Sequence, residues 1–161
     1  MLKVYTDGGV LYNGKDDCKG SSSFIILENE EILYEYSSYV LDDGEICTNN
    51  RAELYGMINT MEYLLSEGLE NEDIEIYSDS KYCVRGINEW VESWEAKDWY
   101  DSYNGRERPN SDLWKQMLVL SRQFSNIAFK WVKGHNKDTW NEYVDGLCSS
   151  LLKKLENETA K

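Results

Sequence analysis

Two aspartates, Asp7 and Asp79, each end a short run in which apolar and polar residues alternate, "LKVYTD" and "IEIYSD". A period of two residues is typical of β-strands, so each aspartate is expected at the carboxyl end of a strand. If the two strands pair in parallel, the carboxylates lie side by side, at the edge where open α/β sheets bind ligands. Two adjacent carboxylates repel each other unless one is protonated or a cation lies between them. Oxygen ligands of this kind suit Mg²⁺ or Mn²⁺.

Four acidic residues are candidates for such a site, and each also has an ordinary structural explanation. Asp79 precedes a helical pattern and fits an N-cap, whereas Asp7 precedes two glycines and fits a turn. Glu53 follows Asn50 by three residues, which is the spacing of a capping pair. Asp145 stands on a helical pattern outside its apolar stripe and fits an exposed position. Taken one at a time, these residues leave both the structural and the functional explanation open.

The elements that would position these residues form a mixed α/β domain. The patterns predict strands at 2–7, 21–28, 31–40, 73–79 and 126–132, and helices at 49–67, 80–94, 111–124 and 139–155. The glycine pair at 8–9 is expected to break or bend the first strand, and Gly86 to hinge the second helix into two. Residues 95–110 are expected to be irregular, and Thr139 with Glu142 to form a capping box.

The composition is that of one globular domain. The 161 residues are 41% hydrophobic and 13% aromatic, which excludes a disordered chain and provides enough apolar surface for a core. The sequence has no run of 18 apolar residues and no apolar signal region, so the chain is expected in the cytoplasm and not in a membrane. The four cysteines, Cys18, Cys47, Cys83 and Cys148, are widely spaced and are expected to be free thiols in a reducing compartment.

The net charge of −13 is the main argument against a nucleic-acid partner. Proteins that bind nucleic acids are usually basic, because neutralising phosphates supplies much of their affinity. The acidic excess is explained by solubility, by a salty environment or, in part, by acids gathered in a cation site. A calcium-binding protein is not indicated, since no segment has the spacing of an EF-hand loop.

Five segments together resemble the type 1 ribonuclease H family in their order and approximate spacing. They are "YTDGG", "TNNRAELYGMI", "YSDSKYCVRGINEWVESW", "WVKGHN" and "NEYVDGL", and the resemblance covers roughly residues 1–155. It implies an RNase H-like α/β fold, in which a five-stranded mixed sheet of order 3-2-1-4-5 carries helices on both faces. It also implies a single domain over residues 1–156, followed by a frayed tail at 157–161.

The activity implied by this resemblance is that of an endoribonuclease that hydrolyses the RNA strand of RNA/DNA hybrids and leaves 5′-phosphate and 3′-hydroxyl ends. The implied metal ligands are Asp7, Glu53, Asp79 and Asp145, which would hold two Mg²⁺ ions, or Mn²⁺, about 4 Å apart. One ion would activate water and the other would stabilise the leaving oxygen. His135 matches the histidine of the family's mobile loop, and the ordinary pKa of imidazole suits proton transfer or help in product release.

Further positions match the family's contacts to the two strands of the hybrid. The resemblance implies RNA contacts for Asn13, Asn49, Asn50 and Lys81, a DNA phosphate pocket at Thr48 and Asn110, and an aromatic channel of Tyr82, Trp90 and Trp94. Lys81 and Ile46 depart from the family, because the first is often uncharged there and the second is an arginine in some members. Residues 95–108 match a protrusion that is often basic, yet hold three basic and four acidic side chains. We therefore expect hybrid binding that is weak and sensitive to salt.

Two other functions remain open. A nuclease of the same fold that acts on DNA would need the same acidic cluster, and a non-catalytic hybrid-binding module would need only the fold. The asparagine pair, the two channel tryptophans and the "KGHN" segment favour the ribonuclease. An intact set of four carboxylates with His135 argues against a binding module. By analogy with the family, the chain is expected to be a monomer.

Overall fold

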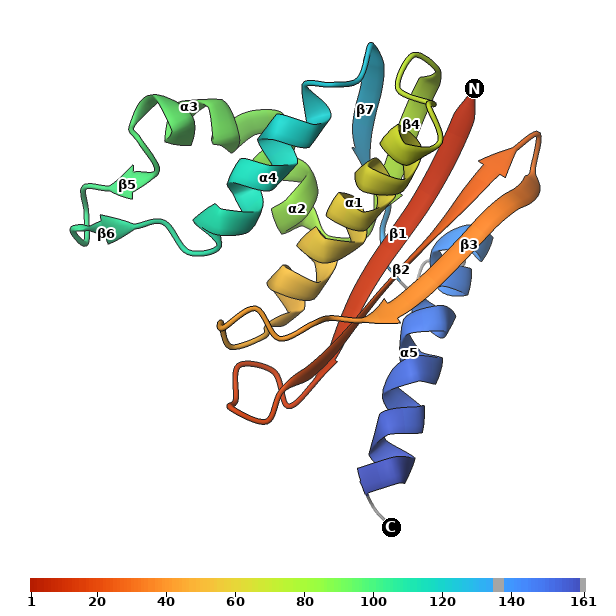
Figure 1. The fold of residues 1–161 in the computed structure, drawn as a ribbon, viewed down its shortest axis with the longest axis horizontal. Helices are drawn as coiled ribbons and strands as arrows, with labels where there is room; N and C mark the ends of the chain where they lie inside the picture. Colours follow the sequence, from red (N-terminus) through yellow and green to blue (C-terminus); the bar gives the residue numbers. More distant parts are fainter. Residues whose placement is uncertain (135–137, 160–161) are drawn as a thin grey trace.

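Five strands form one mixed sheet at the centre of the structure (Figure 1). The computed structural model describes residues 1–134 and 138–159. The strands of this sheet are β1 (Leu2–Leu11), β2 (Lys19–Glu28), β3 (Glu31–Tyr39), β4 (Asp73–Ser78) and β7 (Asn126–Trp131). They lie in the order β3-β2-β1-β4-β7; β2 is antiparallel to β1 and β3, and β4 is parallel to β1 and β7. The predicted sheet order and the parallel pairing of the two aspartate-bearing strands are confirmed.

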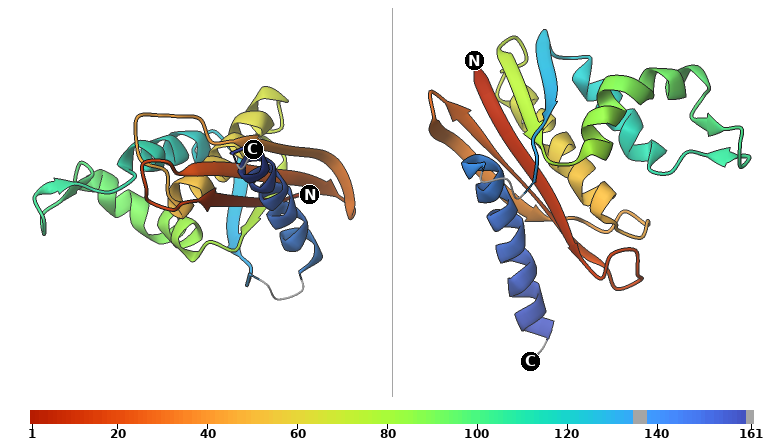
Figure 2. Two further views of the ribbon diagram at one scale, coloured as in Figure 1. Left: turned by 90° about the horizontal axis from the view of Figure 1, so that it is seen from below. Right: turned by 180° about the vertical axis from the view of Figure 1, so that it is seen from behind.

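Helices cover both faces of this sheet (Figure 2). They include α1 (Asn49–Ser66) and α4 (Ser111–Ser121) on one face and α5 (Thr139–Thr159) on the other. The alternation along β1 produces this division, since neighbouring side chains of a strand point to opposite faces. Leu2 and Val4 belong to the main hydrophobic core beneath α1 and α4, whereas Tyr5 packs in a second cluster with Val144 of α5.

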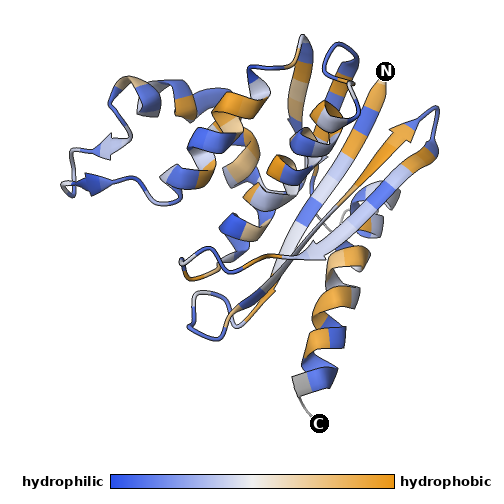
Figure 3. Cartoon of the chain, viewed as in Figure 1, coloured by the Kyte–Doolittle hydropathy of each residue, from blue (hydrophilic) through white to orange (hydrophobic). Residues whose placement is uncertain are grey.

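The apolar stripe predicted on α1 forms the centre of the main core. Its members Leu54, Met57, Ile58, Met61 and Leu64 are at most 2% exposed. On α4 and α5, hydrophobic and hydrophilic segments alternate along each helix, as expected for helices that bury one side (Figure 3). Packing of these amphipathic faces on the sheet therefore fixes where each helix lies.

The glycine pair does not break the first strand, so that part of the expectation is wrong. β1 continues through it to Leu11 and stays paired with β2. Gly8 allows α1 to lie directly on β1, because an added Cβ would lie 2.3 Å from the backbone carbonyl carbon of Ala52 in α1. Any side chain at position 8 would hold α1 away from β1.

The helix expected at 80–94 is divided at Gly86, where a π-helical turn begins. The segments α2 (Lys81–Arg85), the π-helical turn η1 (Gly86–Trp90) and α3 (Val91–Ala96) follow one another with helical backbone angles at both junctions. The absence of a side chain at Gly86 leaves room for the ring of Trp114 in α4, since an added Cβ would lie 2.0 Å from its Cη2 atom. Gly86 therefore lies where the α-helical pattern gives way to a π-helical turn and where two helices make a close contact.

Residues 95–110, expected to be irregular, contain a small hairpin. Strands β5 (Tyr100–Asp101) and β6 (Arg106–Glu107) pair antiparallel and form an arm, residues 97–108, that projects away from the sheet (Figure 1). Trp99 at the base of the arm is 7% exposed and joins it to the main core. The rest of the arm is mostly hydrophilic (Figure 3).

Cys18 and Cys47 form a disulfide, so the expectation of free thiols is wrong for this pair. Their Cα atoms lie 5.8 Å apart although the residues are separated by 29 positions in sequence. The β2–β3 hairpin carries the chain back to the loop after β1, and cysteine spacing alone does not encode that return. Cys83 and Cys148 are free and buried.

Helix α5 differs from its prediction at both ends. Its cap is Asp138, whose Oδ1 accepts the backbone N–H groups of Trp140 and Asn141 at 3.1 and 3.0 Å, in place of the predicted capping box. The helix runs to Thr159, so residues 157–159, placed in a frayed tail by the sequence, are helical. Within the described residues, no helix is long and apolar enough to cross a membrane.

Candidate active site

Asp7 and Asp79 come together just beyond the last parallel pair of β1 and β4; Asp79 directly follows β4, but Asp7 lies within β1 and not at its carboxyl end as expected. The parallel register pairs Tyr5 with Tyr77, whose rings stack with centroids 4.9 Å apart, and each aspartate follows its tyrosine by two residues. Two residues are one period of a strand, so the aspartates share the face of the tyrosines. Glu53 joins them from α1, and one carboxylate oxygen of each residue lies within 4.8 Å of the others. Asp7, Glu53 and Asp79 form what we call the acidic cluster.

Glu53 reaches the cluster because α1 lies directly on β1. Two glycines make this contact, one from each element. At Gly8 the backbone of α1 occupies the place of a side chain, and an added Cβ at Gly56 would lie 2.4 Å from Oγ1 of Thr6. Since no side chain separates the helix from the strand at these points, Glu53 lies next to Asp7.

Local structure does not account for these acids. The N-cap of α1 is Thr48, whose hydroxyl accepts a first-turn N–H at 3.2 Å, so Glu53 belongs to no capping pair. The N-cap of α2 is Ser80, whose hydroxyl accepts a first-turn N–H at 3.2 Å, so Asp79 does not cap that helix. Asp7 lies inside a continuous strand and not in a turn.

Burial makes the acidic cluster electrostatically unfavourable when no cation is bound. Asp7 is 3% exposed, and burial together with the charges of Asp79 and Asp145 raises its pKa to about 8. Burial and the charges of Asp7 and Asp79 hold the pKa of Glu53 well above its ordinary value. Oε2 of Glu53 is buried and has no hydrogen-bond partner among the described residues. Three carboxylates with an unpartnered oxygen fit a hard divalent cation, whose charge would offset their repulsion.

We expect the metal-free chain to melt at a lower temperature at pH 8 than at pH 5. The folded chain keeps a proton on Asp7 up to about pH 8, whereas the unfolded chain releases it near the ordinary value of 3.8. Between these values the folded state binds more protons, so its stability falls as the pH rises. Melting curves in EDTA are expected to differ by at least about 5 °C. Mg²⁺ should raise the melting temperature more at pH 8 than at pH 5; equal melting temperatures in EDTA would contradict the raised pKa.

The fourth predicted carboxylate, Asp145, does not belong to the acidic cluster. Asp145 stands in the first half of α5, outside the 4.8 Å group, yet its charge raises the pKa of Asp7 and of Glu53. The first turn of α5 also approaches the cluster, since Nδ2 of the buried Asn141 donates to Oδ2 of Asp79 at 3.5 Å. His135 lies outside the described residues.

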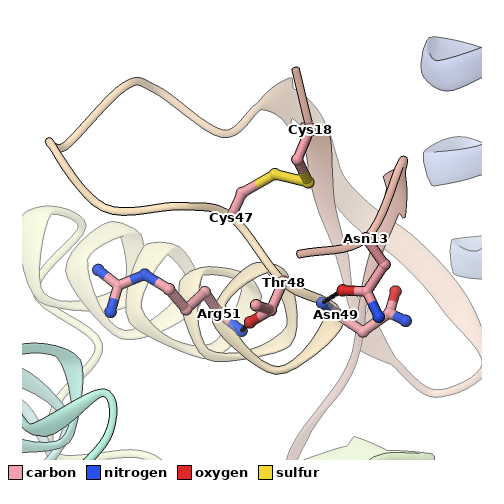
Figure 4. The surroundings of a disulfide bond; sticks show 6 residues. All are labelled: Asn13, Cys18, Cys47, Thr48, Asn49 and Arg51. Atoms are coloured by element: carbon pink, nitrogen blue, oxygen red, sulfur yellow. Dashed lines mark hydrogen bonds between the residues drawn. A yellow bond between two sulfur atoms is a disulfide. The ribbon is translucent and has the colours of Figure 1, made fainter. Parts of the chain in front are cut away.

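The residues predicted to contact RNA lie around the starts of α1 and α2. Oδ1 of Asn13, in the loop after β1, accepts the backbone N–H of Asn49 at 3.0 Å (Figure 4). Both residues are exposed, as is Asn50, so the structure gathers the three asparagines on one exposed surface. Lys81 begins α2, and its Nζ lies 4.6 Å from the centre of the Trp131 ring. That contact restrains a long cationic side chain next to the acidic cluster.

One residue of the predicted aromatic channel, Tyr82, is hydrogen-bonded to one residue of the predicted phosphate pocket, Asn110. The hydroxyl of Tyr82 accepts from Nδ2 of Asn110 at 3.1 Å and from Nε1 of Trp114 at 3.0 Å. The rings of Tyr82, Trp90 and Trp94 follow one another with centroids 6.2 and 5.6 Å apart. All three are half-buried, so each ring both packs on its neighbours and keeps a surface open to solvent.

The chain matches known proteins over almost its whole length. The RNase H family model matches residues 1–153. The chain belongs to the RNase H family. It is 32% identical to the ribonuclease H of Ruthia magnifica subsp. Calyptogena magnifica over 155 residues, which cover 94% of this chain and 95% of the relative. It is 34% identical to the ribonuclease H of Francisella philomiragia subsp. philomiragia over 156 residues, 94% of this chain and 91% of the relative.

A solved structure agrees with the fold. LC11-RNase H1, crystallised in complex with an RNA/DNA hybrid, is similar with a TM-score of 0.68 at 20% identity, covering 94% of this chain and 99% of that one. All four predicted carboxylates fall inside the segment that matches the RNase H family.

In this member of the RNase H family, sequence reasoning missed Trp131. It ends β7, and its Nε1–H donates to the backbone carbonyl of Asp79 at 3.1 Å while its ring lies beneath the Lys81 ammonium. The parallel register places it there, since β4 and β7 pair Ser78 with Trp131. Only the pairing of two strands far apart in sequence could have shown that this tryptophan adjoins the cluster.

Arg51 was also missed. Its side chain is 5% exposed, and its guanidinium donates to Asp43 at 2.7 Å and to both carboxylate oxygens of Asp112 at 2.9 and 2.7 Å. These hydrogen bonds raise the pKa of Arg51, and the bonds to Asp112 lower the pKa of that carboxyl. Because Asp112 is 61 residues away along the chain, no local pattern reveals this ion pair.

Thr48 and Asn110, predicted to share a DNA phosphate pocket, do line one open pocket of about 650 Å³. Ile46 also lines it, at the position where some family members have an arginine. The ionisable residues of its lining are Asp43, Glu45, Glu107 and Asp112 together with Arg51, Arg108 and Lys115. Acids therefore outnumber bases in this pocket, four to three.

Proposed function

We propose that this chain is a metal-dependent endoribonuclease that hydrolyses the RNA strand of RNA/DNA hybrids. The observation that carries the proposal is the acidic cluster, which lies just beyond the parallel pairing of β1 and β4 and has its ligand atoms within 4.8 Å of one another. Membership in the RNase H family supports it. The products would be a 5′-phosphate and a 3′-hydroxyl, since water attacks phosphorus and the bond to the 3′-oxygen breaks.

The cofactor of this proposal is a pair of Mg²⁺ ions, with Mn²⁺ as the alternative. When bound, the ions would supply an activated water and positive charge at the leaving oxygen. Asp7, which is buried between Glu53 and Asp79, would bind both ions. Glu53 and Asp79 would complete one site and Asp145 the other. We propose that His135 transfers a proton or assists product release.

The chain's polar and aromatic surface would select the hybrid. We propose that Asn13, Asn49, Asn50 and Lys81 contact the RNA strand, whose 2′-hydroxyl groups are displayed in the shallow minor groove. Tyr82, Trp90 and Trp94 would contact the DNA strand through their exposed ring surfaces, and Thr48 and Asn110 would bind one of its phosphates. Hydrogen bonds and ring contacts carry more of this recognition than charge, because the pocket is acidic and the arm has no net positive charge.

The positions of the hydrophobic clusters and the acidic cluster also bear on the extent of the domain and on its oligomeric state. We propose that residues 1–156 act as one domain and as a monomer, since both hydrophobic clusters and the acidic cluster are formed within this segment. We also propose that the protein works in the cytoplasm on hybrids formed there.

The first test is cleavage of a labelled RNA/DNA hybrid with Mg²⁺ or Mn²⁺ at low and moderate salt. We expect internal cuts in the RNA strand by the parent and none by Asp79→Asn. Asp73→Asn is the matched control, because Asp73 stands at the opposite, exposed end of the same strand. Comparing cleavage at the two salt concentrations measures how much of hybrid binding depends on charge.

Other outcomes would lead to other functions. Cleavage of duplex DNA in preference to the hybrid would indicate a DNA nuclease of the same fold. A folded parent that binds the hybrid but cuts it under no condition would indicate a binding module.

A further inference from the structure

The disulfide joins two segments that each carry a residue of the proposed RNA contact. Cys18 ends the loop of residues 12–18, which follows β1 and includes Asn13. Cys47 directly precedes Thr48, the N-cap of α1, and Asn49, its first residue. Figure 4 shows the bond, the cap and the two asparagines in one small region at the start of α1.

Two hydrogen bonds complete the junction. The backbone N–H of Gly14 donates to the carbonyl of Cys47 at 3.2 Å, and the N–H of Asn49 donates to Oδ1 of Asn13 at 3.0 Å. The N–H of Asn49 belongs to the first turn of α1, where backbone donors have no partner within the helix. Asn13 supplies that partner, so the position of its side chain relative to α1 depends on where the loop lies.

The loop has little else to hold it in this place. Residues 12–17 are all exposed, and none of them belongs to a hydrophobic cluster. Tyr12 adopts a φ of +58°, a left-handed conformation that is unfavourable for a residue with a side chain. Exposed segments with few apolar contacts open at low free energy. The covalent bond at Cys18 is therefore the strongest restraint on the loop.

We propose that Cys18 and Cys47 are positioning residues for hybrid binding, and that their disulfide holds Asn13 against Asn49 as one preformed RNA contact. The inference rests on the proposed function. A dithiol reductant would break the bond: each sulfur gains a proton and an electron, and the dithiol closes to its own disulfide. The freed loop must then be ordered each time a hybrid binds, which weakens binding without altering the acidic cluster.

The test compares oxidised and dithiol-reduced parent in steady-state cleavage of the hybrid. Reduction is expected to raise KM about fivefold, the effect of ordering one or two side chains, and to leave kcat within about twofold. The Cys18→Ser/Cys47→Ser variant should show the higher KM with or without reductant. Cys83 and Cys148 remain in that variant, and any response to reductant there would have to come from them.

Asn13→Ala separates positioning from a general loss of structure. If the disulfide acts through Asn13, reduction raises KM in the parent but not in Asn13→Ala. The same comparison in an Asp79→Asn background measures the dissociation constant of a labelled hybrid by fluorescence anisotropy, independently of turnover.

An unchanged KM and dissociation constant on reduction, or an equal rise with Asn13→Ala, would overturn the inference while leaving the nuclease function intact. Redox-dependent binding without cleavage by the parent would support the inference and remove the nuclease; no binding in either state would overturn both.

Discussion

Glu53→Gln is expected to abolish cleavage of the RNA strand while making the metal-free chain more stable at pH 8. The substitution keeps the shape of the side chain but removes a charge from a buried position beside Asp7 and Asp79. Loss of one ligand charge should reduce kcat at least about 10³-fold, since metal ions contribute several kcal/mol to stabilising the transition state. Without metal, the same change removes a buried carboxyl group whose ionisation is disfavoured by burial and by the charges of Asp7 and Asp79, so the melting temperature in EDTA should rise by about 5 °C.

Glu62→Gln is the matched control for this prediction. Glu62 lies on the same helix and is exposed, so its neutralisation should change neither kcat nor the melting temperature. Cleavage assays and melting curves in EDTA and in Mg²⁺ measure both effects. Activity retained by Glu53→Gln would remove Glu53 from the metal site, and a lower melting temperature in EDTA would show that its charge is compensated in the folded chain.

Gly8→Ala is expected to destabilise the chain by about 3 kcal/mol or more and to eliminate cleavage. The added methyl group would lie 2.3 to 2.5 Å from backbone atoms of α1, which unlike a side chain cannot rotate away. Helix α1 must then move from β1 and carry Glu53 away from Asp7. A displacement of this kind reduces activity strongly even when the chemical groups are intact.

Gly9→Ala provides the comparison one residue further along the strand. Its added methyl group would approach Cδ1 of Leu152 at 3.3 Å, and a leucine side chain can shift by a few tenths of an ångström. Urea denaturation and kcat should therefore be close to those of the parent. If Gly8→Ala and Gly9→Ala behave alike, the close approach of α1 and β1 is not what positions Glu53.

The sequence predicted those parts of the structure that depend on local periodicity. Alternation in the strands and the stripe of α1 identified the core positions, and the repeated tyrosine-to-aspartate spacing identified the parallel pair. The errors arose where a local pattern had a non-local cause. Gly8 looked like a strand break, and the close packing at Gly86 was not predicted, because their contacts with α1 and Trp114 come from elements that follow later in the chain.

The candidate site divides in the same way. The carboxylates of the acidic cluster were visible from their types and spacing, together with the family resemblance. Trp131 and the Arg51 ion pair were not, since strand register and packing bring their partners from distant positions. The disulfide was missed for a related reason, because a separation of 29 residues says nothing about whether two cysteines face each other.

The Arg51 ion pair has a consequence for how the pocket at Thr48 and Asn110 would distinguish the strands of a hybrid. The carboxylates of Asp43 and Asp112 accept hydrogen bonds from the Arg51 guanidinium, in the way that the oxygens of a bound phosphate would. Because the Arg51 guanidinium is already paired with two carboxylates, a DNA phosphate in the pocket would gain little electrostatic attraction from it. Selection at this point must come from shape and from the neutral donors of Thr48 and Asn110. Unlike the rest of the binding surface, the pocket should then discriminate between strands equally well in dilute and in concentrated salt.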